Sequence, residues 1–133
     1  KLTAAVMFID LDGFKNINDE FSLSAGDEVL KVVSNRMIKE LRNTDTVARI
    51  GGDEFLIIMT NIKDESVIAS VAQKIIDAVR ETIFYNNKAL RVSASIGIAI
   101  CPVDDIDCDG LIKKADSAMY TVKKSGKSNY AFY

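Results

Sequence analysis

A β-hairpin is encoded in residues 48–59, which read Ala48-Arg49-Ile50-Gly51-Gly52-Asp53-Glu54-Phe55-Leu56-Ile57-Ile58-Met59. Two adjacent glycines between two β-type runs predict a tight turn, because glycine supplies the positive φ angles that such turns require. A plain hairpin does not need two carboxylates where the turn meets the second strand. Asp53 and Glu54 are therefore either solvated charges or ligands for a cation.

The composition is that of one globular domain. The chain has 133 residues, of which 48% are hydrophobic and 27% charged, and its net charge is −2. We expect a single domain over residues 1–133. Because the net charge is slightly negative, we expect no nucleic-acid partner. Because residue 3 already runs into a strand, we interpret the chain as a fragment of a longer multidomain protein.

No apolar run of the sequence reaches membrane-spanning length, and the first residues lack a signal-peptide layout. We therefore expect a cytoplasmic domain without direct membrane contact, such as the cytoplasmic part of a membrane-anchored protein.

Cysteine and histidine usage narrows the chemistry further. The chain has two cysteines, Cys101 and Cys108, and no histidine. Two cysteines alone form neither a metal site nor a disulfide framework. Without histidine, zinc would lack its usual nitrogen ligands, and every mechanism with a histidine base is excluded.

Hydrophobic periodicity predicts an α+β sandwich. The continuous apolar run 4–9 is typical of a central strand buried on both faces, whereas the alternation of residues 90–100 predicts a strand covered by helices on one side only. Apolar stripes predict a helix after an N-cap at Ser24 and further helices over about 63–79 and 111–122. With the hairpin and an edge strand at 128–133, the elements predict helices packed on a largely antiparallel sheet.

A second pair of carboxylates, Asp10 and Asp12, ends the first strand. One interpretation is structural, because aspartate starts helices well. The other is functional: if this strand is a sheet neighbour of the hairpin, Asp10 and Asp53 lie on strands about 4.8 Å apart. Like charges at that distance repel each other unless a cation is shared, and Mg²⁺ binds through one or two carboxylates together with substrate phosphates.

Five ordered motifs give the chain a family resemblance. They are Phe8-Ile9-Asp10-Leu11-Asp12-Gly13-Phe14-Lys15-Asn16-Ile17-Asn18-Asp19, Gly26-Asp27, Ala48 to Phe55, Ser95-Ile96-Gly97-Ile98, and Ala115-Asp116-Ser117-Ala118-Met119-Tyr120 followed by Lys123 and Gly126-Lys127. In this order they resemble the GGDEF-domain diguanylate cyclases. The resemblance implies a ferredoxin-like, palm-type sandwich of the nucleotidyl-cyclase kind, with a mostly antiparallel central sheet, flanking helices and a GGDEF β-hairpin.

The resemblance also implies an activity: condensation of two GTP molecules to cyclic di-GMP with release of pyrophosphate, in a homodimer attached to an upstream sensory domain. Asp10 and Asp53 would hold Mg²⁺ (or Mn²⁺) with help from the Leu11 carbonyl, and Glu54 would be a second metal ligand or base, with Asp12 a supporting carboxylate. The remaining substrate-binding positions would be Phe14, Lys15, Asn18, Asp27, Gly51, Gly52, Lys123 and Lys127, of which Asn18 and Asp27 read guanine and the lysines contact phosphate. Without the resemblance, these polar residues fit a solvated surface equally well.

Arg42-Asn43-Thr44-Asp45 stands where the family has its inhibitory product site, an Arg-x-x-Asp element. Arginine can hold a phosphate with two parallel hydrogen bonds, and the aspartate can orient it. The alternative is a surface ion pair at a helix end, which contributes roughly 0–1 kcal/mol.

Two departures from the family pattern bear on activity. Ser22-Leu23 replaces the usual Gly-His, at a position where we expect a helix C-terminus with positive φ, a conformation that is less favourable for serine. Lys127 replaces the usual arginine. Neither departure removes a metal ligand, so we expect an active enzyme, weakened at most. The alternatives are a regulatory module that binds GTP or cyclic di-GMP without turnover and a purely structural ferredoxin-like domain.

Overall fold

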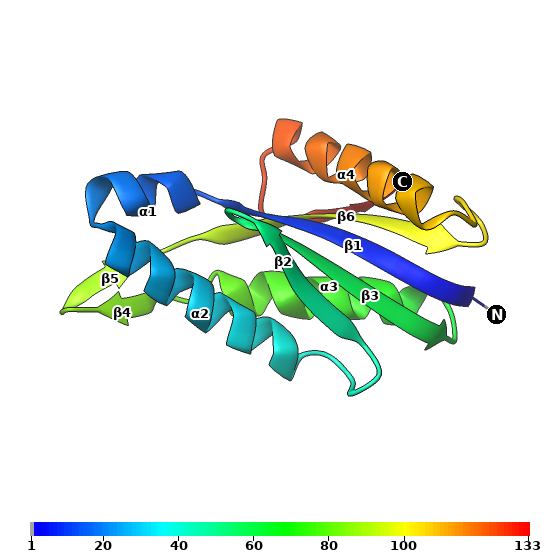
Figure 1. The fold of residues 1–133 in the computed structure, drawn as a ribbon, viewed down its shortest axis with the longest axis horizontal. Coiled ribbons are helices and arrows are strands. Elements are labelled where there is room, and N and C mark those ends of the chain that lie inside the picture. The colour runs from blue at the N-terminus through cyan, green and yellow to red at the C-terminus, as the bar shows by residue number, and fades with distance from the viewer. Residues whose placement is uncertain (1) are drawn as a thin grey trace.

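A five-stranded sheet forms the centre of the molecule in the computed structural model, which describes residues 2–133. The strand order is β2-β3-β1-β6-β7, and every neighbouring pair is antiparallel except β6 and β7 (Figure 1). The strands are β1 (Leu2–Asp12), β2 (Thr46–Gly51), β3 (Glu54–Ile62), β6 (Ser93–Cys101) and β7 (Tyr130–Phe132). The predicted α+β class, the hairpin around the glycines and the C-terminal edge strand are confirmed.

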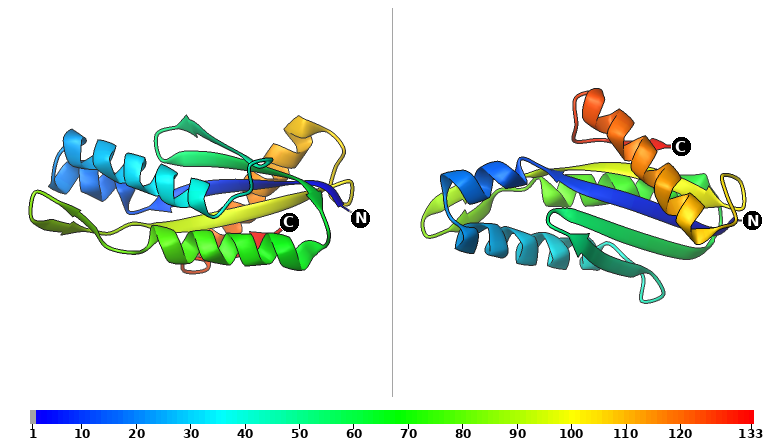
Figure 2. Two further views of the ribbon diagram at one scale, coloured as in Figure 1. Left: turned by 90° about the horizontal axis from the view of Figure 1, so that it is seen from below. Right: turned by 45° about the horizontal axis from the view of Figure 1, so that its top comes forward.

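Helices cover both faces of this sheet. On one face lie α2 (Leu23–Lys39) and α3 (Glu65–Val79), and on the other lies α4 (Cys108–Lys124); the short α1 (Phe14–Glu20) leads from β1 into α2 (Figure 2). Alternate β1 residues face the two layers: Met7 and Ile9 join the core under α2 and α3, and Val6 and Phe8 join the smaller core under α4. This two-sided burial explains why the run 4–9 is continuously apolar.

The expectation that the strand of residues 90–100 is covered on one side only is wrong. Seven consecutive residues of β6, Ala94 to Ile100, are buried. The small residues of the alternation make room for α4, because a Cβ at Gly97 would overlap the backbone of that helix at Ala115, Ala118 and Met119. The pattern that predicted a solvent face therefore marks a close helix–strand approach.

The start of α2 also differs from the prediction. The helix begins at Leu23 rather than after Ser24, and Ser22 is its N-cap, whose Oγ accepts a hydrogen bond of 3.0 Å from the Ala25 N–H. Ser22 has an extended backbone with φ of 175°, so it carries none of the strain expected of a non-glycine residue at a helix C-terminus. Serine is among the best N-cap residues, and this departure from the family pattern favours the fold.

One hairpin of the structure was not predicted from the sequence. A second, small hairpin of β4 (Ile83–Tyr85) and β5 (Lys88–Leu90) precedes β6. Its turn residues Asn86 and Asn87 have φ of 49° and 65°, the left-handed conformation that two-residue hairpin turns require. Asn-Asn is a weaker turn signal than Asn-Gly, and the two strands have only three residues each, which is why periodicity did not reveal them.

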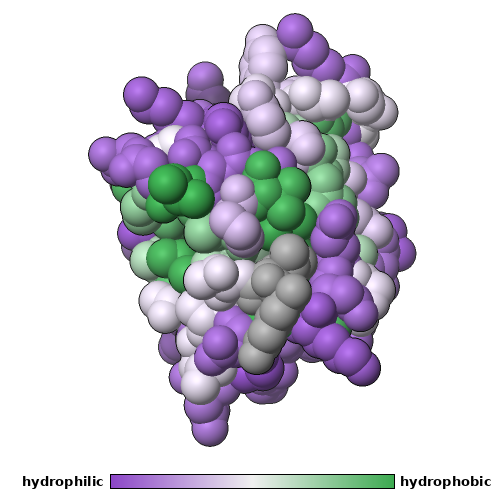
Figure 3. Space-filling view, turned by 90° about the vertical axis from the view of Figure 1, so that its right-hand side faces the viewer, coloured by the Kyte–Doolittle hydropathy of each residue, from purple (hydrophilic) through white to green (hydrophobic). Residues whose placement is uncertain are grey.

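The two ends of the molecule differ. The β4–β5 hairpin and the connection from α1 to α2 lie at one end, and the N-terminus and the loop after β6 lie at the other (Figure 1). Apolar side chains come to the surface at this second end (Figure 3), where Val103 and Ile106 of that loop are largely exposed.

Among the helices of residues 2–133, none is long and apolar enough to cross a bilayer.

Candidate nucleotide site

The carboxyl end of β1 and the glycine turn are joined directly. The register pairs Asp10 with Glu54, and the Leu11 N–H donates a 3.1 Å hydrogen bond to the Asp53 carbonyl just beyond the last pair. Two segments more than 40 residues apart thus bring three carboxylates together, and the predicted proximity of Asp10 and Asp53 is confirmed. The Leu11 side chain is buried, so only its backbone can take part in a site.

The turn itself is open. Gly51 and Gly52 have φ of 154° and 46°, as the hairpin prediction requires, and a Cβ at either would meet no atom within 4 Å. The Arg49 side chain braces the turn with a 2.8 Å hydrogen bond from Nε to the Gly52 carbonyl. A ligand can therefore approach the turn backbone closely without displacing a side chain.

One carboxylate oxygen of Asp10 has no hydrogen-bond partner in the described residues. Its Oδ1 atom is buried without any hydrogen bond from residues 2–133, and its other oxygen lies 3.6 Å from the Lys123 ammonium. Burial, partly opposed by Lys123 and reinforced by Asp53 and Glu54, raises the pKa of Asp10 from 3.8 to about 6. A buried carboxylate oxygen without a partner costs free energy that a bound cation would recover.

These donors fit a hard divalent cation that is shared with a substrate. Within the described chain, no group of three or more histidine, cysteine, aspartate or glutamate side chains is arranged to hold a metal ion on its own. Mg²⁺ binds readily through one or two carboxylates and completes its octahedron with phosphate and water oxygens. Asp10 and Asp53 match that lower requirement.

Asp12, expected as a supporting carboxylate, is fully hydrogen-bonded to its neighbours. Its two oxygens accept four hydrogen bonds, from Lys123 Nζ (2.6 Å), Ser95 Oγ (2.8 Å), Ser93 Oγ (2.6 Å) and the Ser128 N–H (3.2 Å). Burial alone would raise the pKa of Asp12, but the hydrogen bonds from Lys123, Ser93 and Ser95 outweigh it and lower that pKa. Sequence reasoning missed the roles of Ser93, Ser95 and Ser128. Ser93 and Ser95 belong to the polar alternation along β6, whereas Ser128 lies in the turn after α4 and carries no comparable signal.

The two C-terminal lysines do not share a helix face. Lys123 is in the last turn of α4, but the helix ends at Lys124, and Lys127 follows in a turn with φ of 65°. Their four-residue spacing would place them on one helix face only if the helix continued to residue 127, and Gly126, with φ of 115°, turns the chain away from the helix axis before that point. Lys127 is exposed on this turn.

The residues expected to read guanine lie on α1 and α2, which pack on each other. A Cβ at Gly26 would overlap the Asn18 amide, so glycine lets Asn18 lie directly over the first turns of α2, and Asp27, the residue after Gly26, is exposed. Lys15 is exposed on α1, whereas the Phe14 side chain is buried in the main core. Phe14 can contact a ligand through its backbone only.

Arg42 and Asp45 form a tight pair away from the glycine turn. Arg42 donates from Nη2 to Asp45 Oδ1 (2.8 Å) and from Nε to Asp45 Oδ2 (3.2 Å), and it also bonds the Thr60 carbonyl of β3. The Asp45 side chain is 1% exposed and that of Arg42 is 45% exposed. Asp45 thus orients a guanidinium whose outer side remains open to solvent.

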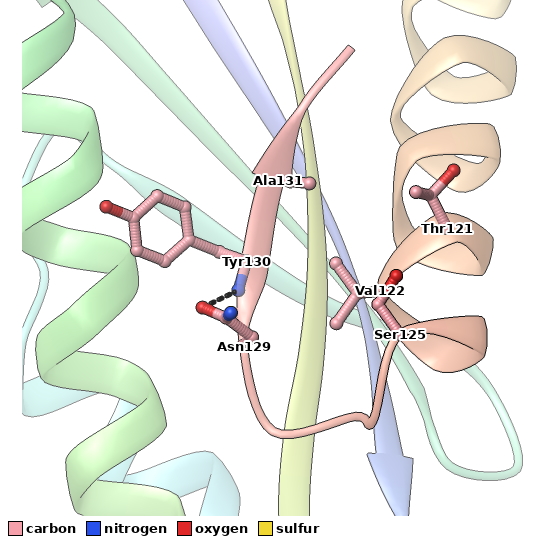
Figure 4. Close-up of a pocket in the computed structure, with 6 residues that line it drawn as sticks. All are labelled: Thr121, Val122, Ser125, Asn129, Tyr130 and Ala131. Atoms are coloured by element: carbon pink, nitrogen blue, oxygen red, sulfur yellow. Dashed lines mark hydrogen bonds between the residues drawn. The ribbon is translucent and has the colours of Figure 1, made fainter.

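A cavity of about 190 Å³ lies between α4 and β7 and is separate from the acidic site. Figure 4 shows it lined by Thr121, Val122, Ser125, Asn129, Tyr130 and Ala131, with the Asn129 side chain bonded to the Tyr130 N–H. It contains none of the residues expected to bind a nucleotide. The acidic site lies where β1 ends beside the β2–β3 turn, and a larger hollow of about 370 Å³ adjoins it at Asp12, Ser93 and Ser128.

Comparison with known proteins identifies the family. Residues 1–129 match the family model described as "Diguanylate cyclase, GGDEF domain". The chain is 37% identical over 129 residues to cyclic di-GMP phosphodiesterase NbdA of Pseudomonas aeruginosa (97% of this chain, 16% of the relative) and 37% identical over 129 residues to diguanylate cyclase A of Treponema denticola (96% and 34%).

Among solved structures, the GGDEF domain of YfiN from Pseudomonas aeruginosa superposes with a TM-score of 0.95 at 34% identity, covering 98% of this chain and 82% of that one. The chain spans 16% and 34% of the lengths of the two curated relatives. Motifs, sheet order and comparisons agree that this chain is a GGDEF domain and belongs to the diguanylate cyclase family.

Proposed function

We propose that this domain converts two molecules of GTP into cyclic di-GMP and pyrophosphate, with Mg²⁺ or Mn²⁺ as its cofactor. The observation that supports this most strongly is the buried, unpartnered oxygen of Asp10 beside Asp53 and Glu54. A structural domain would gain nothing from that arrangement, whereas a nucleotidyltransferase needs a cation-binding edge that is open to a triphosphate.

In this proposal Asp10, Asp53 and the Leu11 carbonyl hold the ion. When bound, Mg²⁺ supplies positive charge at the α-phosphate, where charge develops in the transition state. Glu54 lies at the same edge and serves as a second ligand or as the acceptor of the proton from the attacking 3′-hydroxyl.

The rest of the site binds the nucleotide. Asn18 and Asp27 offer an amide and a carboxylate, which suit the mixed donor and acceptor edge of guanine. Lys15, Lys123 and Lys127 supply positive charge for the phosphates. The open side of Gly51 and Gly52 lets the nucleotide approach the turn backbone, and the backbone of Phe14 contributes from the start of α1.

Each domain then binds one GTP, and the cyclic product requires two domains facing each other. A homodimer, aligned by an attached sensory domain, is therefore part of the proposed mechanism. Arg42 and Asp45 form the proposed inhibitory site for cyclic di-GMP, since the exposed side of the guanidinium is held ready by a buried carboxylate.

A second candidate function is a regulatory module that binds GTP or cyclic di-GMP without turnover. The position of Lys123 favours it, because an ammonium 3.6 Å from Asp10 supplies part of the charge that a metal ion would bring. The name of the relative NbdA, a phosphodiesterase, is in keeping with a GGDEF domain that serves another activity.

The two functions are separated by incubating the protein with GTP and Mg²⁺ at increasing protein concentration and measuring cyclic di-GMP by chromatography. The cyclase proposal expects product, with a rate per molecule that rises with protein concentration because two half-sites must meet. Asp53→Asn should reduce turnover by at least about a hundredfold, the usual size of an electrostatic contribution to a transition state, while leaving the circular dichroism spectrum unchanged.

GTP binding without product in the wild type would exclude the cyclase and establish the module. No product, together with no binding of either GTP or added cyclic di-GMP, would exclude both functions. Asp19→Asn, which removes an exposed carboxylate from α1, is the matched control and should retain full turnover.

A further inference from the structure

We propose that Asp12 is a positioning residue for the substrate triphosphate: it binds no metal and no nucleotide, but holds Lys123 and the turn that carries Lys127 where the phosphates arrive. This inference rests on the proposed function, because it concerns how GTP is bound. It gives a specific role to Asp12, for which the resemblance implies only a supporting carboxylate.

The hydrogen bonds of Asp12 leave it no capacity for a metal ion. Its side chain is 7% exposed, and each oxygen already accepts two hydrogen bonds at 2.6–3.2 Å. Asp10, two residues earlier on the same face of β1, is the opposite case, with one oxygen lacking any partner within residues 2–133. Asp10 therefore has an oxygen that can bind a cation, whereas both oxygens of Asp12 are already occupied by hydrogen bonds.

Lys123 lies between these two carboxylates but closer to Asp12. Its Nζ is 2.6 Å from Asp12 and 3.6 Å from Asp10. A lysine side chain is long and flexible, and beside Asp10 alone its ammonium would settle on that carboxylate and compete with a cation. Asp12 prevents this by providing a closer, more buried partner, so that Lys123 stays at the edge of the cation site with its remaining donors free for phosphate.

The same carboxylate fixes the turn after α4. Gly126, Lys127 and Ser128 have φ of 115°, 65° and 48°, so two non-glycine residues in succession adopt the left-handed conformation. Such residues persist only where the surrounding structure holds them. Two hydrogen bonds do so here: the Lys127 N–H to the Val122 carbonyl (3.0 Å) and the Ser128 N–H to Asp12 (3.2 Å).

The test measures binding of two nucleotides, 3′-deoxy-GTP and GMP, by calorimetry in the presence of Mg²⁺. Because 3′-deoxy-GTP lacks the attacking hydroxyl, it reports binding without turnover, and GMP lacks the β- and γ-phosphates. Asp12→Asn keeps the shape of the side chain but removes its charge. We expect it to weaken 3′-deoxy-GTP binding by roughly tenfold or more, the effect of losing a charged phosphate contact, and to change GMP binding by less than about twofold.

A double-mutant cycle tests whether Asp12 acts through Lys123. Lys123→Met should weaken 3′-deoxy-GTP binding, and the Asp12→Asn/Lys123→Met double variant should weaken it by clearly less than the product of the two single effects. Asp77→Asn removes an exposed carboxylate that pairs with Arg80 at 3.1 Å, and this matched control should bind both nucleotides like the wild type. If Asp12→Asn does not fold, Ser93→Ala/Ser95→Ala loosens the same carboxylate and should show a smaller selective loss.

The outcomes are distinct. The role of Asp12 is supported if Asp12→Asn weakens binding of 3′-deoxy-GTP but not of GMP, and if the double variant loses less affinity than the product of the two single losses. Equal losses for the two nucleotides, no loss, or fully multiplicative effects overturn it. If the wild-type protein does not bind 3′-deoxy-GTP, the proposed function is overturned. If the wild type and Asp12→Asn bind 3′-deoxy-GTP equally tightly, only the inference about Asp12 is overturned.

Discussion

The surroundings of the Asp10 side chain are unfavourable for stability, as the proposed cation site would require. Asp10 is half-buried, has an unpartnered oxygen and lies beside two other carboxylates, and these surroundings raise its pKa to about 6. Nothing in the fold of residues 2–133 compensates it fully, since Lys123 is closer to Asp12. Proteins commonly retain such locally unfavourable groups at functional sites.

The pH dependence of stability should reveal this cost. Because the folded-state pKa of Asp10 lies above 3.8, the folded protein keeps this proton between about pH 4 and 6 while the unfolded chain has released it, so this group lowers the free energy of unfolding as pH rises through that range. Asp10→Asn should therefore be more stable than wild type at pH 7 without divalent cations, by on the order of 1 kcal/mol after allowance for solvent screening, and equal to it near pH 4.

Urea denaturation at both pH values measures the difference. Asp19→Asn, an exposed carboxylate of α1, should not reproduce the pattern. A difference between Asp10→Asn and wild type that is the same at pH 4 and pH 7 would contradict the role given to burial here.

At the scale of elements, α4 and β6 are in unusually close contact. Gly97 lets the helix backbone rest directly on the strand, with Ala115 and Ala118 as the small residues on the helix side. An added methyl group has no flexible side chain to push aside, because the atoms that it would meet belong to the α4 backbone. The close approach brings Lys123, two turns further along α4, to Asp10 and Asp12.

Gly97→Ala should accordingly lower the free energy of unfolding by about 2 kcal/mol, within the usual range for overpacking a core. Gly110→Ala, in the first turn of α4, is the matched control, since the atoms nearest to its new Cβ belong to the side chain of Asp105 and not to a helix backbone. Alanine also favours helix formation there. Thermal unfolding of both variants checks the prediction, which fails if the two changes have equal effects.

At the scale of the whole molecule, the β2–β3 hairpin connects the two candidate sites. Asp53 and Glu54 lie at its turn, and Arg42 bonds the Thr60 carbonyl at the other end of β3. The two sites are therefore separated by the length of one strand, and a variant in one should leave the other intact.

Arg42→Ala should relieve inhibition by cyclic di-GMP, raising the concentration needed for half-inhibition by roughly tenfold or more, because a charged, bidentate phosphate contact is lost. The initial rate in the absence of product should stay within about twofold of wild type. Dose–response curves with added cyclic di-GMP measure both quantities. Arg80→Ala, a change in an exposed arginine of the surface pair with Asp77, serves as control. Unchanged inhibition in Arg42→Ala would remove the inhibitory role from this site.

Much of the fold and of the site could be predicted from the sequence, where the signal is local or the pairing follows from strand order. The hairpin, the strand of residues 4–9 and the meeting of Asp10 with Asp53 belong to this class. The roles of Ser22 and Gly97 could not be predicted, because the conformation of Ser22 and the helix over Gly97 arise only in the folded chain. Asp12 accepts hydrogen bonds from Ser93, Ser95, Lys123 and Ser128, which are 81 to 116 positions away in the sequence and so beyond the reach of any local pattern.

The contact at Gly97 has a mechanical consequence. Together with the Asp12–Lys123 ion pair, it attaches α4 to the sheet at two separate points, one backbone on backbone and the other charge on charge. A helix held in this way can neither slide along β6 nor roll on it without losing one of the two attachments. These two attachments tie α4 to β6 and to the carboxylates of β1 as one rigid unit. In the proposed homodimer, a signal would then change the distance and angle between two such units rather than the shape of either one.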